Sequence, residues 1–249
     1  MHKYDAIVLG SGIAGLGAVL GFLEQGKTVL VIAKNYLQGE ASPAAAGILD
    51  PFLEIEDPQH PLLNLTIPAF KHFESSLKSD VGLPTSYITY KKTGMIYLAL
   101  SHADESGLDR RFSWQRETGI RCKFLNESVL RKLEPLVSSG VLGGLFYPDA
   151  GRISARHFIR SLVQSVRCRG VKIIRSAATP ELLIRSNRVQ GVRLGKHRFW
   201  SDIVVNAMGS WANENFPKGV VPKVLPVRGQ ILIVSSGGGP ACEHILHSL

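Results

Sequence analysis

The chain opens with two short apolar runs that flank a segment of small residues. Residues 6–9 (Ala-Ile-Val-Leu) are continuously apolar, which is typical of a buried parallel strand. Residues 16–25 mix apolar and small residues, and Gly26 follows them as a helix stop. Residues 28–32 are again apolar and β-branched. The pattern predicts a strand–helix–strand unit.

The rest of the chain alternates less regularly between helical and strand patterns. Helices are expected over residues 61–78, 103–118, 128–133 and 155–169. Strands are expected over residues 86–90, 94–100, 143–147, 171–175, 182–185, 189–194 and 199–206, with a turn at 186–188. This order predicts an α/β fold in which an α+β region is inserted between the opening unit and the later strands that return to its sheet.

Gly10-Ser11-Gly12-Ile13-Ala14-Gly15 follows the first strand directly. In this context the glycines form a dinucleotide-binding fingerprint. Gly10 permits a tight turn, Gly12 lets a pyrophosphate approach the helix N-terminus, and Gly15 lets helix and strand pack closely. The alternative is that the glycines serve helix–sheet packing alone. An acid that would hold a ribose at the end of the second strand is missing, since Ala33 and Lys34 stand there.

A second segment, residues 39–48, consists almost entirely of small residues. Such a loop packs little of its own, so we expect another group to lie against its backbone, with a flexible linker as the alternative. In a flavoprotein, the group beside such a loop is the isoalloxazine ring. Lys34 by itself would suit a 2′-phosphate, as in NADP.

Charge is distributed unevenly along the 249 residues, which carry a formal net charge of +9. Residues 151–200 contain twelve lysines and arginines and one acid, Glu181. This basic segment suits an anionic partner such as RNA or a membrane face, or else it forms ordinary solvated surfaces, which we favour because no RNA-binding motif accompanies it. Three cysteines without paired spacing fit a reducing compartment. We find no targeting segment and expect a cytoplasmic protein with no metal site.

Five segments in order resemble the FAD-dependent D-amino acid oxidase family, and within it the glycine oxidases of thiamine biosynthesis. They are residues 5–15, 41–49, 146–153, 204–211 and 226–230. The resemblance implies an FAD-binding Rossmann-like domain with an inserted α+β substrate domain. We expect the first to comprise residues 1–55 and 150–215, and the second residues 60–145 and 220–249, lacking the C-terminal part of the family pattern.

The resemblance also implies which residues bind FAD. Gly10, Gly12 and Gly15 form the turn, with Ile13 and Ala14 at the pyrophosphate and Ala33 and Lys34 near the adenosine ribose. Thr179 is expected to contact the adenine through its backbone, and Gly209 to lie at a close-approach turn over the cofactor. The flavin side is expected to be lined by Ala41, Ser42, Ala45, Ala46, Gly47 and Ile48.

In this family a neutral amine passes a hydride from its Cα to flavin N5, and the imine product is hydrolysed. The resemblance therefore implies oxidation of glycine, another small amine or a D-amino acid, with thiamine biosynthesis as one setting. The arginine that pairs with the substrate carboxylate lies beyond the matched segments, so we assign no catalytic residue. Arg228 is expected to be structural, and His244 and His247 to belong to a frayed tail.

Two other functions stay open at this point. The same fold occurs as the oxidase part of a tRNA-modifying enzyme, which the basic segment would suit. A degenerate, non-catalytic FAD-binding fragment would explain both the missing ribose acid and the missing C-terminal pattern. Self-association into a homo-oligomer is compatible with either.

Overall fold

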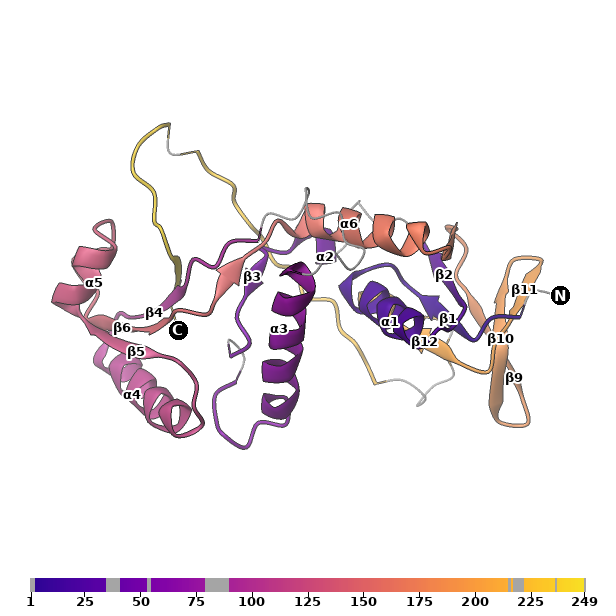
Figure 1. Cartoon of the computed structure of the whole chain (residues 1–249), viewed down its shortest axis with the longest axis horizontal. Coiled ribbons are helices and arrows are strands. Elements are labelled where there is room, and N and C mark those ends of the chain that lie inside the picture. The colour runs from indigo at the N-terminus through magenta and orange to yellow at the C-terminus, as the bar shows by residue number, and fades with distance from the viewer. Residues whose placement is uncertain are drawn as a thin grey trace. The chain divides into compact units, whose positions relative to one another are not determined.

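The computed structural model describes residues 3–34, 41–52, 55–78, 90–214, 216, 222–235 and 237–248 (Figure 1). These residues form two compact units. The first contains the described residues of 1–46 and 155–230, and the second those of 47–81, 89–154 and 231–249. The chain thus passes between units after residues 46, 154 and 230, whereas we expected breaks near 55, 150 and 215. A cofactor role for the first unit and a substrate role for the second stay predictions.

A four-stranded parallel sheet forms the centre of the first unit. Its order is β12-β1-β2-β8, and the strands span Val204–Asn206, Ala6–Leu9, Val29–Ala33 and Lys172–Arg175. Strands β1 and β2 are buried at every position, as their unbroken apolar sequence predicts. Helix α1 (Ile13–Glu24) contacts β1, β2 and β12. The structure confirms the predicted strand–helix–strand unit, with the helix starting directly after Gly12.

Helix α6 (Ala155–Cys168) contacts α1 and the short helix α2 (Ala41–Ala44) within the first unit. Its apolar residues Phe158, Ile159, Leu162, Val163 and Val166 are buried, while Arg156, Arg160 and Arg167 are exposed. This division into two faces is the amphipathic pattern that predicted the helix. It also accounts for part of the basic segment as the outer face of one helix.

Three antiparallel strands form a second sheet in this unit, in the order β11-β10-β9 (His197–Trp200, Arg188–Leu194 and Glu181–Arg185). Ser186 and Asn187 have φ of 48° and 58°, the left-handed values that two-residue hairpin turns require. Arg188 pairs with Arg185, so the turn is one residue shorter than the predicted 186–188.

The prediction of one strand over residues 199–206 is wrong. Residues 197–200 belong to β11 in the antiparallel sheet, and residues 204–206 form β12 in the parallel sheet. Ser201 lies at the break and is 1% exposed. Its hydroxyl accepts from the N–H of Ile203 and lies within 3.0 Å of the carbonyl oxygen of Asp5. Ser201 and Asp202 interrupt the apolar run, and the contact of the Ser201 hydroxyl with the distant Asp5 lies where the chain passes from one sheet to the other.

The second unit is built on a mixed sheet in the order β13-β4-β6-β5. These strands span Ile245–Ser248, Met95–Ala99, Gly143–Tyr147 and Lys123–Asn126. Helices α3 (Leu63–Lys78), α4 (His102–Glu117) and α5 (Glu127–Leu133) belong to the same unit, as does the two-stranded pair β3 (Ile48–Leu49) and β7 (Gly151–Arg152). The predicted strand 86–90 lies outside the described residues except for Tyr90.

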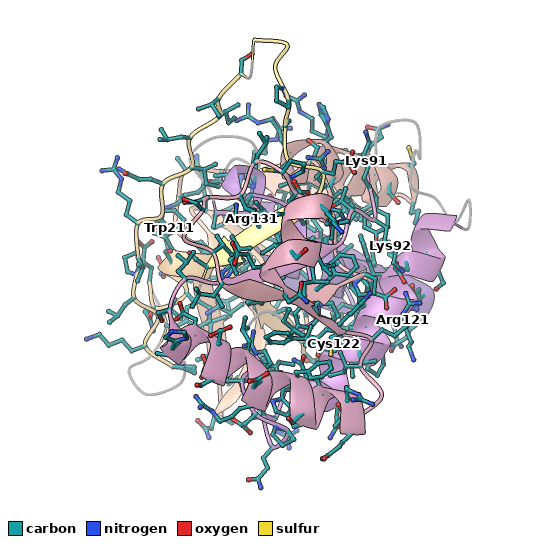
Figure 2. The ribbon with its side chains drawn as sticks, turned by 90° about the vertical axis from the view of Figure 1, so that its left-hand side faces the viewer. Lys91, Lys92, Arg121, Cys122, Arg131 and Trp211 are labelled. Carbon is teal, nitrogen blue, oxygen red and sulfur yellow. The ribbon has the colours of Figure 1, made fainter. Side chains whose placement is uncertain are left out.

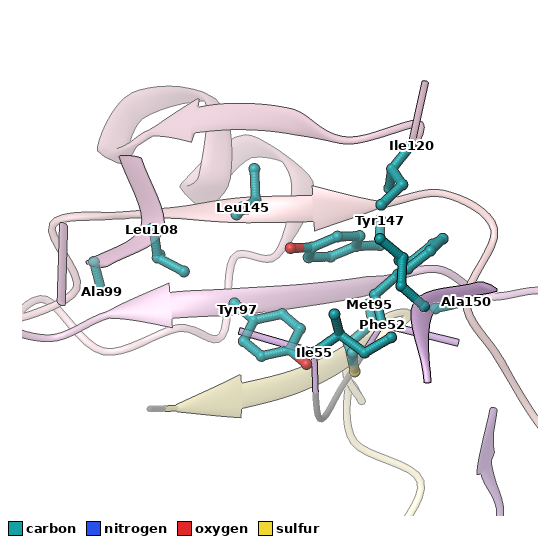
Figure 3. Close-up of a cluster of buried hydrophobic side chains, with 11 residues drawn as sticks. Phe52, Ile55, Met95, Tyr97, Ala99, Leu108, Ile120, Leu145, Tyr147 and Ala150 are labelled. Atoms are coloured by element: carbon teal, nitrogen blue, oxygen red, sulfur yellow. The ribbon is translucent and has the colours of Figure 1, made fainter. Parts of the chain in front are cut away.

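Side chains of this sheet alternate between two cores, as the period of a strand requires. On one face Tyr97 and Tyr147 pack together with ring centroids 5.3 Å apart, among Met95, Leu145 and Leu108 (Figure 3). On the other face Ile96 packs in a cluster with Leu125, Leu130, Val137 and Val141.

The prediction that His244 and His247 lie in a frayed tail is also wrong. Strand β13 pairs in parallel with β4, with His247 opposite Tyr97. The two rings are 4.9 Å apart, and His244 contacts the ring of Phe146.

Among the described residues, no helix combines the length and the apolar character needed to cross a membrane.

Candidate cofactor site

Glycine occupies the three fingerprint positions for different structural reasons. Gly10 has a φ of +107°, and a Cβ built there would lie 2.2 Å from the carbonyl oxygen of Ala207. A Cβ on Gly15 would lie 2.2 Å from the carbonyl oxygen of Gly10. Both glycines are therefore required by packing at the turn. Gly12 differs, because a Cβ there would meet only the Ser42 side chain, at 3.0 Å, among the described residues.

The N-terminus of α1 is open at Gly12. Gly12, at the N-cap, has no side chain that could cap the helix, and the first turn of the helix contains no acidic residue. Ile13 is 48% exposed, and Ala14 is also exposed. The Ile13 N–H donates to the Ser42 hydroxyl at 3.0 Å. First-turn N–H groups have no partner within a helix, and the helix dipole favours negative charge beside them. Together these features suit a phosphate group.

Ser42 belongs to the predicted small-residue loop, which contains the helical turn α2. Pro43 is buried, whereas Ala44, Ala45 and Ala46 are exposed. The predicted flavin-side residues thus divide between the units. Ala41, Ser42, Ala45 and Ala46 belong to the first, while Gly47 and Ile48 belong to the second, where Gly47 accepts a hydrogen bond from the N–H of Ile153.

The remaining predicted cofactor residues follow strands of the parallel sheet. Lys34 follows β2, Gly209 begins a 3-10 turn after β12, and Thr179 lies between β8 and β9. Because β12, β1 and β2 are parallel neighbours, the segments that follow them share the carboxyl edge of the sheet, together with the Gly10 turn. This edge is where dinucleotides bind in open α/β sheets. Gly12, with its room at the helix N-terminus, fits the pyrophosphate of FAD.

A buried polar group in the second unit carried no signal in the sequence. The Asp50 Oδ1 accepts from the N–H of Phe52 at 3.0 Å, while its Oδ2 is buried without a partner among the described residues. Burial raises the pKa of Asp50 from 3.8 to about 6. A second buried polar contact in this unit is satisfied, because the Tyr147 hydroxyl donates to the side-chain oxygen of Gln115 at 2.7 Å. Asp50 lies two residues after the small-residue loop, yet no sequence pattern distinguishes it from an exposed acid.

A surface charge network lies elsewhere in the same unit. Asp149 pairs with Arg121 and with Lys92, whose Nζ lies 2.7 Å from Oδ1 of Asp149. Figure 2 labels Lys92 and Arg121. The Arg121 guanidinium holds the pKa of Asp149 below its usual value. A cavity of about 430 Å³ beside this network is lined by Arg116, Lys123, Cys122 and Phe146, among others. Burial raises the pKa of the Cys122 thiol, which makes it a poor nucleophile.

Comparison with known proteins identifies the class to which this fold and site belong. The sequence profile of the DAO family, described as FAD dependent oxidoreductase, matches residues 5–247. The chain belongs to this family. FAD is the cofactor that the family uses, and the open helix N-terminus beside Gly12 suits its pyrophosphate.

Individual relatives show which members of this family the chain resembles. The bifunctional protein ThiO/ThiG of Synechocystis is 28% identical over 94% of this chain and 34% of its own length. Glycine oxidase of Bacillus licheniformis is 26% identical over 98% of this chain and 65% of its own length. The crystal structure of glycine oxidase from Bacillus cereus matches with a TM-score of 0.71 and 27% identity, covering 84% of this chain and 58% of that one. The chain therefore spans between about a third and two thirds of these relatives.

Proposed function

We propose that the chain binds FAD and serves the oxidation of glycine, another small amine or a D-amino acid. The observation that carries the proposal is the open N-terminus of α1, where Gly12 leaves room and Ser42 contacts the first N–H group. Relatives named glycine oxidase and ThiO/ThiG support the substrate class. Thiamine biosynthesis is one setting in which such an activity would be used.

FAD, when bound, would accept a hydride from the Cα of the amine. The role of this chain's residues is to bind and orient. The first-turn N–H groups of α1 other than that of Ile13, which donates to Ser42, would hold the pyrophosphate together with the helix dipole. Gly12 would let the pyrophosphate approach the backbone. The exposed Ala45 and Ala46 would leave the flavin side unobstructed. Because a positioned neutral amine needs no strong base, we assign no proton-transfer role to any side chain.

The proposal is tested with the purified full chain and added FAD. A flavin absorption band that stays with the protein through gel filtration is expected, and anaerobic addition of glycine, sarcosine or D-alanine should bleach it. Gly12→Ala should reduce FAD retention, because the added methyl group would lie 3.0 Å from the Ser42 hydroxyl and would occupy the approach of the pyrophosphate. Gly17→Ala is the matched control, since no atom of the described residues outside the helix backbone lies within 4 Å of a Cβ there. Failure of the wild-type chain to retain FAD would contradict the proposal.

A non-catalytic FAD-binding fragment is the main competing proposal. It predicts the same flavin band and the same effect of Gly12→Ala, but no bleaching by any amine under anaerobic conditions. Reduction by a chemical reductant such as dithionite gives the control that the bound flavin is competent. The two proposals are therefore separated by the amine titration alone.

For the basic segment we favour an ordinary solvated surface, and a polyanion such as tRNA is the alternative. Exposed Arg156 and Arg160 lie one helical turn apart on α6, and neither has an ion-pair partner in the described part of the chain. Binding through such cations weakens steeply with salt. Retention of tRNA at low salt that disappears at high salt would support this partner, and salt-independent binding or none would contradict it.

A further inference from the structure

The end of β2 has no carboxylate for a bound ribose. Ala33 is 8% exposed, and its carbonyl oxygen accepts a hydrogen bond from the N–H of Ser176 at 3.0 Å. In dinucleotide-binding folds an Asp or Glu in this region accepts a hydrogen bond from the ribose 2′-hydroxyl. Ala33 has no side-chain acceptor, so another group must serve if the ribose is recognised in this way.

A carboxylate from a distant segment lies close to this position. Nζ of Lys34, the residue after β2, is 3.9 Å from Oε2 of Glu214. The same ammonium lies 5.3 Å from the centroid of the Trp211 ring. Lys34 thus contacts two side chains of the segment that follows β12. The Glu214 side chain is 44% exposed, so its oxygens are accessible to a ligand.

The backbone that carries Glu214 is held by a succession of hydrogen bonds. The N–H of Glu214 donates to the carbonyl of Trp211 at 3.0 Å, and the N–H of Trp211 donates to that of Met208 at 3.1 Å. The Asn206 side chain donates to the carbonyl oxygen of Ala212 at 2.8 Å. Asn206 is the last residue of β12. The position of Glu214 is therefore determined by the end of a strand of the parallel sheet.

The sheet order shows where this contact lies. Strand β1 stands between β2 and β12, so the pair formed by Lys34 and Glu214 spans the carboxyl end of β1, at the edge that carries the Gly10 turn. A dinucleotide crosses an α/β sheet at this same edge, with its adenosine ribose toward the strand after the glycine turn. Glu214 is brought from β12 toward the side where that ribose would lie.

We propose that Glu214 accepts the hydrogen bond of the adenosine ribose 2′-hydroxyl of FAD, in place of the acid missing at Ala33. Lys34 is the positioning residue that holds the carboxylate near β2. The inference rests on the proposed FAD binding and adds to it the residue that recognises the ribose. A carboxylate from another segment can serve as well as one at the end of β2. Recognition of the ribose requires only a hydrogen-bond acceptor beside its 2′-hydroxyl, whatever the position of that acceptor in the sequence.

The test measures the affinity of the full chain for three ligands by flavin fluorescence: FAD, FAD lacking the adenosine 2′-hydroxyl, and FMN, which lacks the adenosine. Glu214→Ala should weaken FAD binding about tenfold, as loss of a hydrogen bond to a charged acceptor does. Glu214→Gln, which keeps an uncharged acceptor, should lose less. Glu181→Ala is the matched control, since Glu181 is a similarly exposed ion-paired glutamate (49%) on the antiparallel sheet.

The thermodynamic cycle distinguishes a direct contact from a structural effect. The 2′-deoxy ligand should bind the wild-type chain about tenfold more weakly than FAD, and Glu214→Ala should then cost nothing further. FMN affinity should be the same in all variants. Equal FAD affinity of wild type and Glu214→Ala, or the same loss for the 2′-deoxy ligand, would overturn the assignment of Glu214 while leaving FAD binding intact. Failure of wild type to bind FAD would refute the proposed function itself.

Discussion

Oε1 of Glu134 lies 2.7 Å from Nδ1 of His244 and also accepts the backbone N–H of that residue at 2.7 Å. The same oxygen accepts the N–H of Glu243 at 2.9 Å. Glu134 ends helix α5 and is 2% exposed, and His244 directly precedes strand β13. One buried carboxylate thus fixes the start of the terminal strand to a helix 110 residues earlier in the chain.

Glu134→Ala should therefore destabilise the second unit strongly. The substitution leaves two backbone N–H groups and the His244 ring without their acceptor, and loss of one partner from a buried charged contact costs about 3 kcal/mol. The free energy of unfolding, measured by urea denaturation, should fall by this order. Glu127→Ala, which removes an exposed pair with Arg131 on the same helix, should cost about 0.5 kcal/mol or less. Equal effects of the two variants would contradict the anchoring role.

The buried carboxyl of Asp50 should make stability depend on pH. Because burial raises its folded pKa to about 6 from 3.8, the folded state binds the proton more tightly than the unfolded state. Its contribution to stability is present below pH 4 and is lost as the pH rises from about 4 to 6, by about 3 kcal/mol at most. Asp50→Asn should remove this decline and be more stable than wild type above pH 6.

Urea denaturation between pH 4 and pH 7 measures this effect. Asp57→Asn is a suitable control, since Asp57 is exposed and likewise accepts a hydrogen bond from a backbone N–H two residues on. The control should follow the wild-type dependence on pH. A decline in Asp50→Asn as steep as that of wild type would show that another group is responsible.

Two glycines in and before α1 should respond in opposite ways to alanine. Gly10→Ala would place a Cβ 2.2 Å from a backbone oxygen at a φ of +107°, so the turn must move and the first unit should lose several kcal/mol, about 3 or more. The Cβ of Gly17→Ala would have no neighbour within 4 Å in the described part of the chain, apart from the helix's own backbone. This substitution should stabilise the helix by up to about 1 kcal/mol. Thermal unfolding followed by far-UV circular dichroism measures whether each substitution lowers or raises the stability. Comparable tolerance at the two positions would contradict the close packing at Gly10.

Substitution of Ser201 should lower the stability more than the small size of its side chain suggests. Ser201→Ala removes a buried hydroxyl that serves the Ile203 N–H and a carbonyl of the neighbouring backbone, leaving those groups unsatisfied at a cost of about 1–3 kcal/mol. Ser106→Ala, which removes an exposed hydroxyl bonded to the His102 carbonyl within α4, should be neutral within about 0.5 kcal/mol. Differential scanning calorimetry of both variants tests the contrast, and a neutral Ser201→Ala would refute it.

Local patterns predicted most elements, because burial and backbone preference act over a few residues. Strand β6 has the predicted bounds 143–147, and α4 and α5 begin within one residue of their predicted starts. Strand β13 was missed because its apolar character is slight and its place depends on β4 and Glu134. Residues 199–206 were misread because the polar pair Ser201 and Asp202 was counted within one apolar strand, whereas the chain changes from one sheet to the other there.

The candidate site divides in the same way. Gly10, Gly12 and Gly15 could be identified from the sequence alone by their spacing after a strand. A positive φ or a close backbone approach explains Gly10 and Gly15, whereas no such constraint acts on Gly12. Asp50 and Glu214 could not, because an acid in the sequence carries no sign of whether folding will bury it or bring it to the edge of a sheet.

The sequence by itself determined the opening strand–helix–strand unit, the glycine turn and the small-residue loop, since each follows from conformational limits on neighbouring residues. The tertiary structure alone decided that Lys34 meets Glu214 and that Glu134 holds His244. Those contacts join segments far apart in the chain, and their geometry depends on the order of strands in a sheet, which local preferences do not encode.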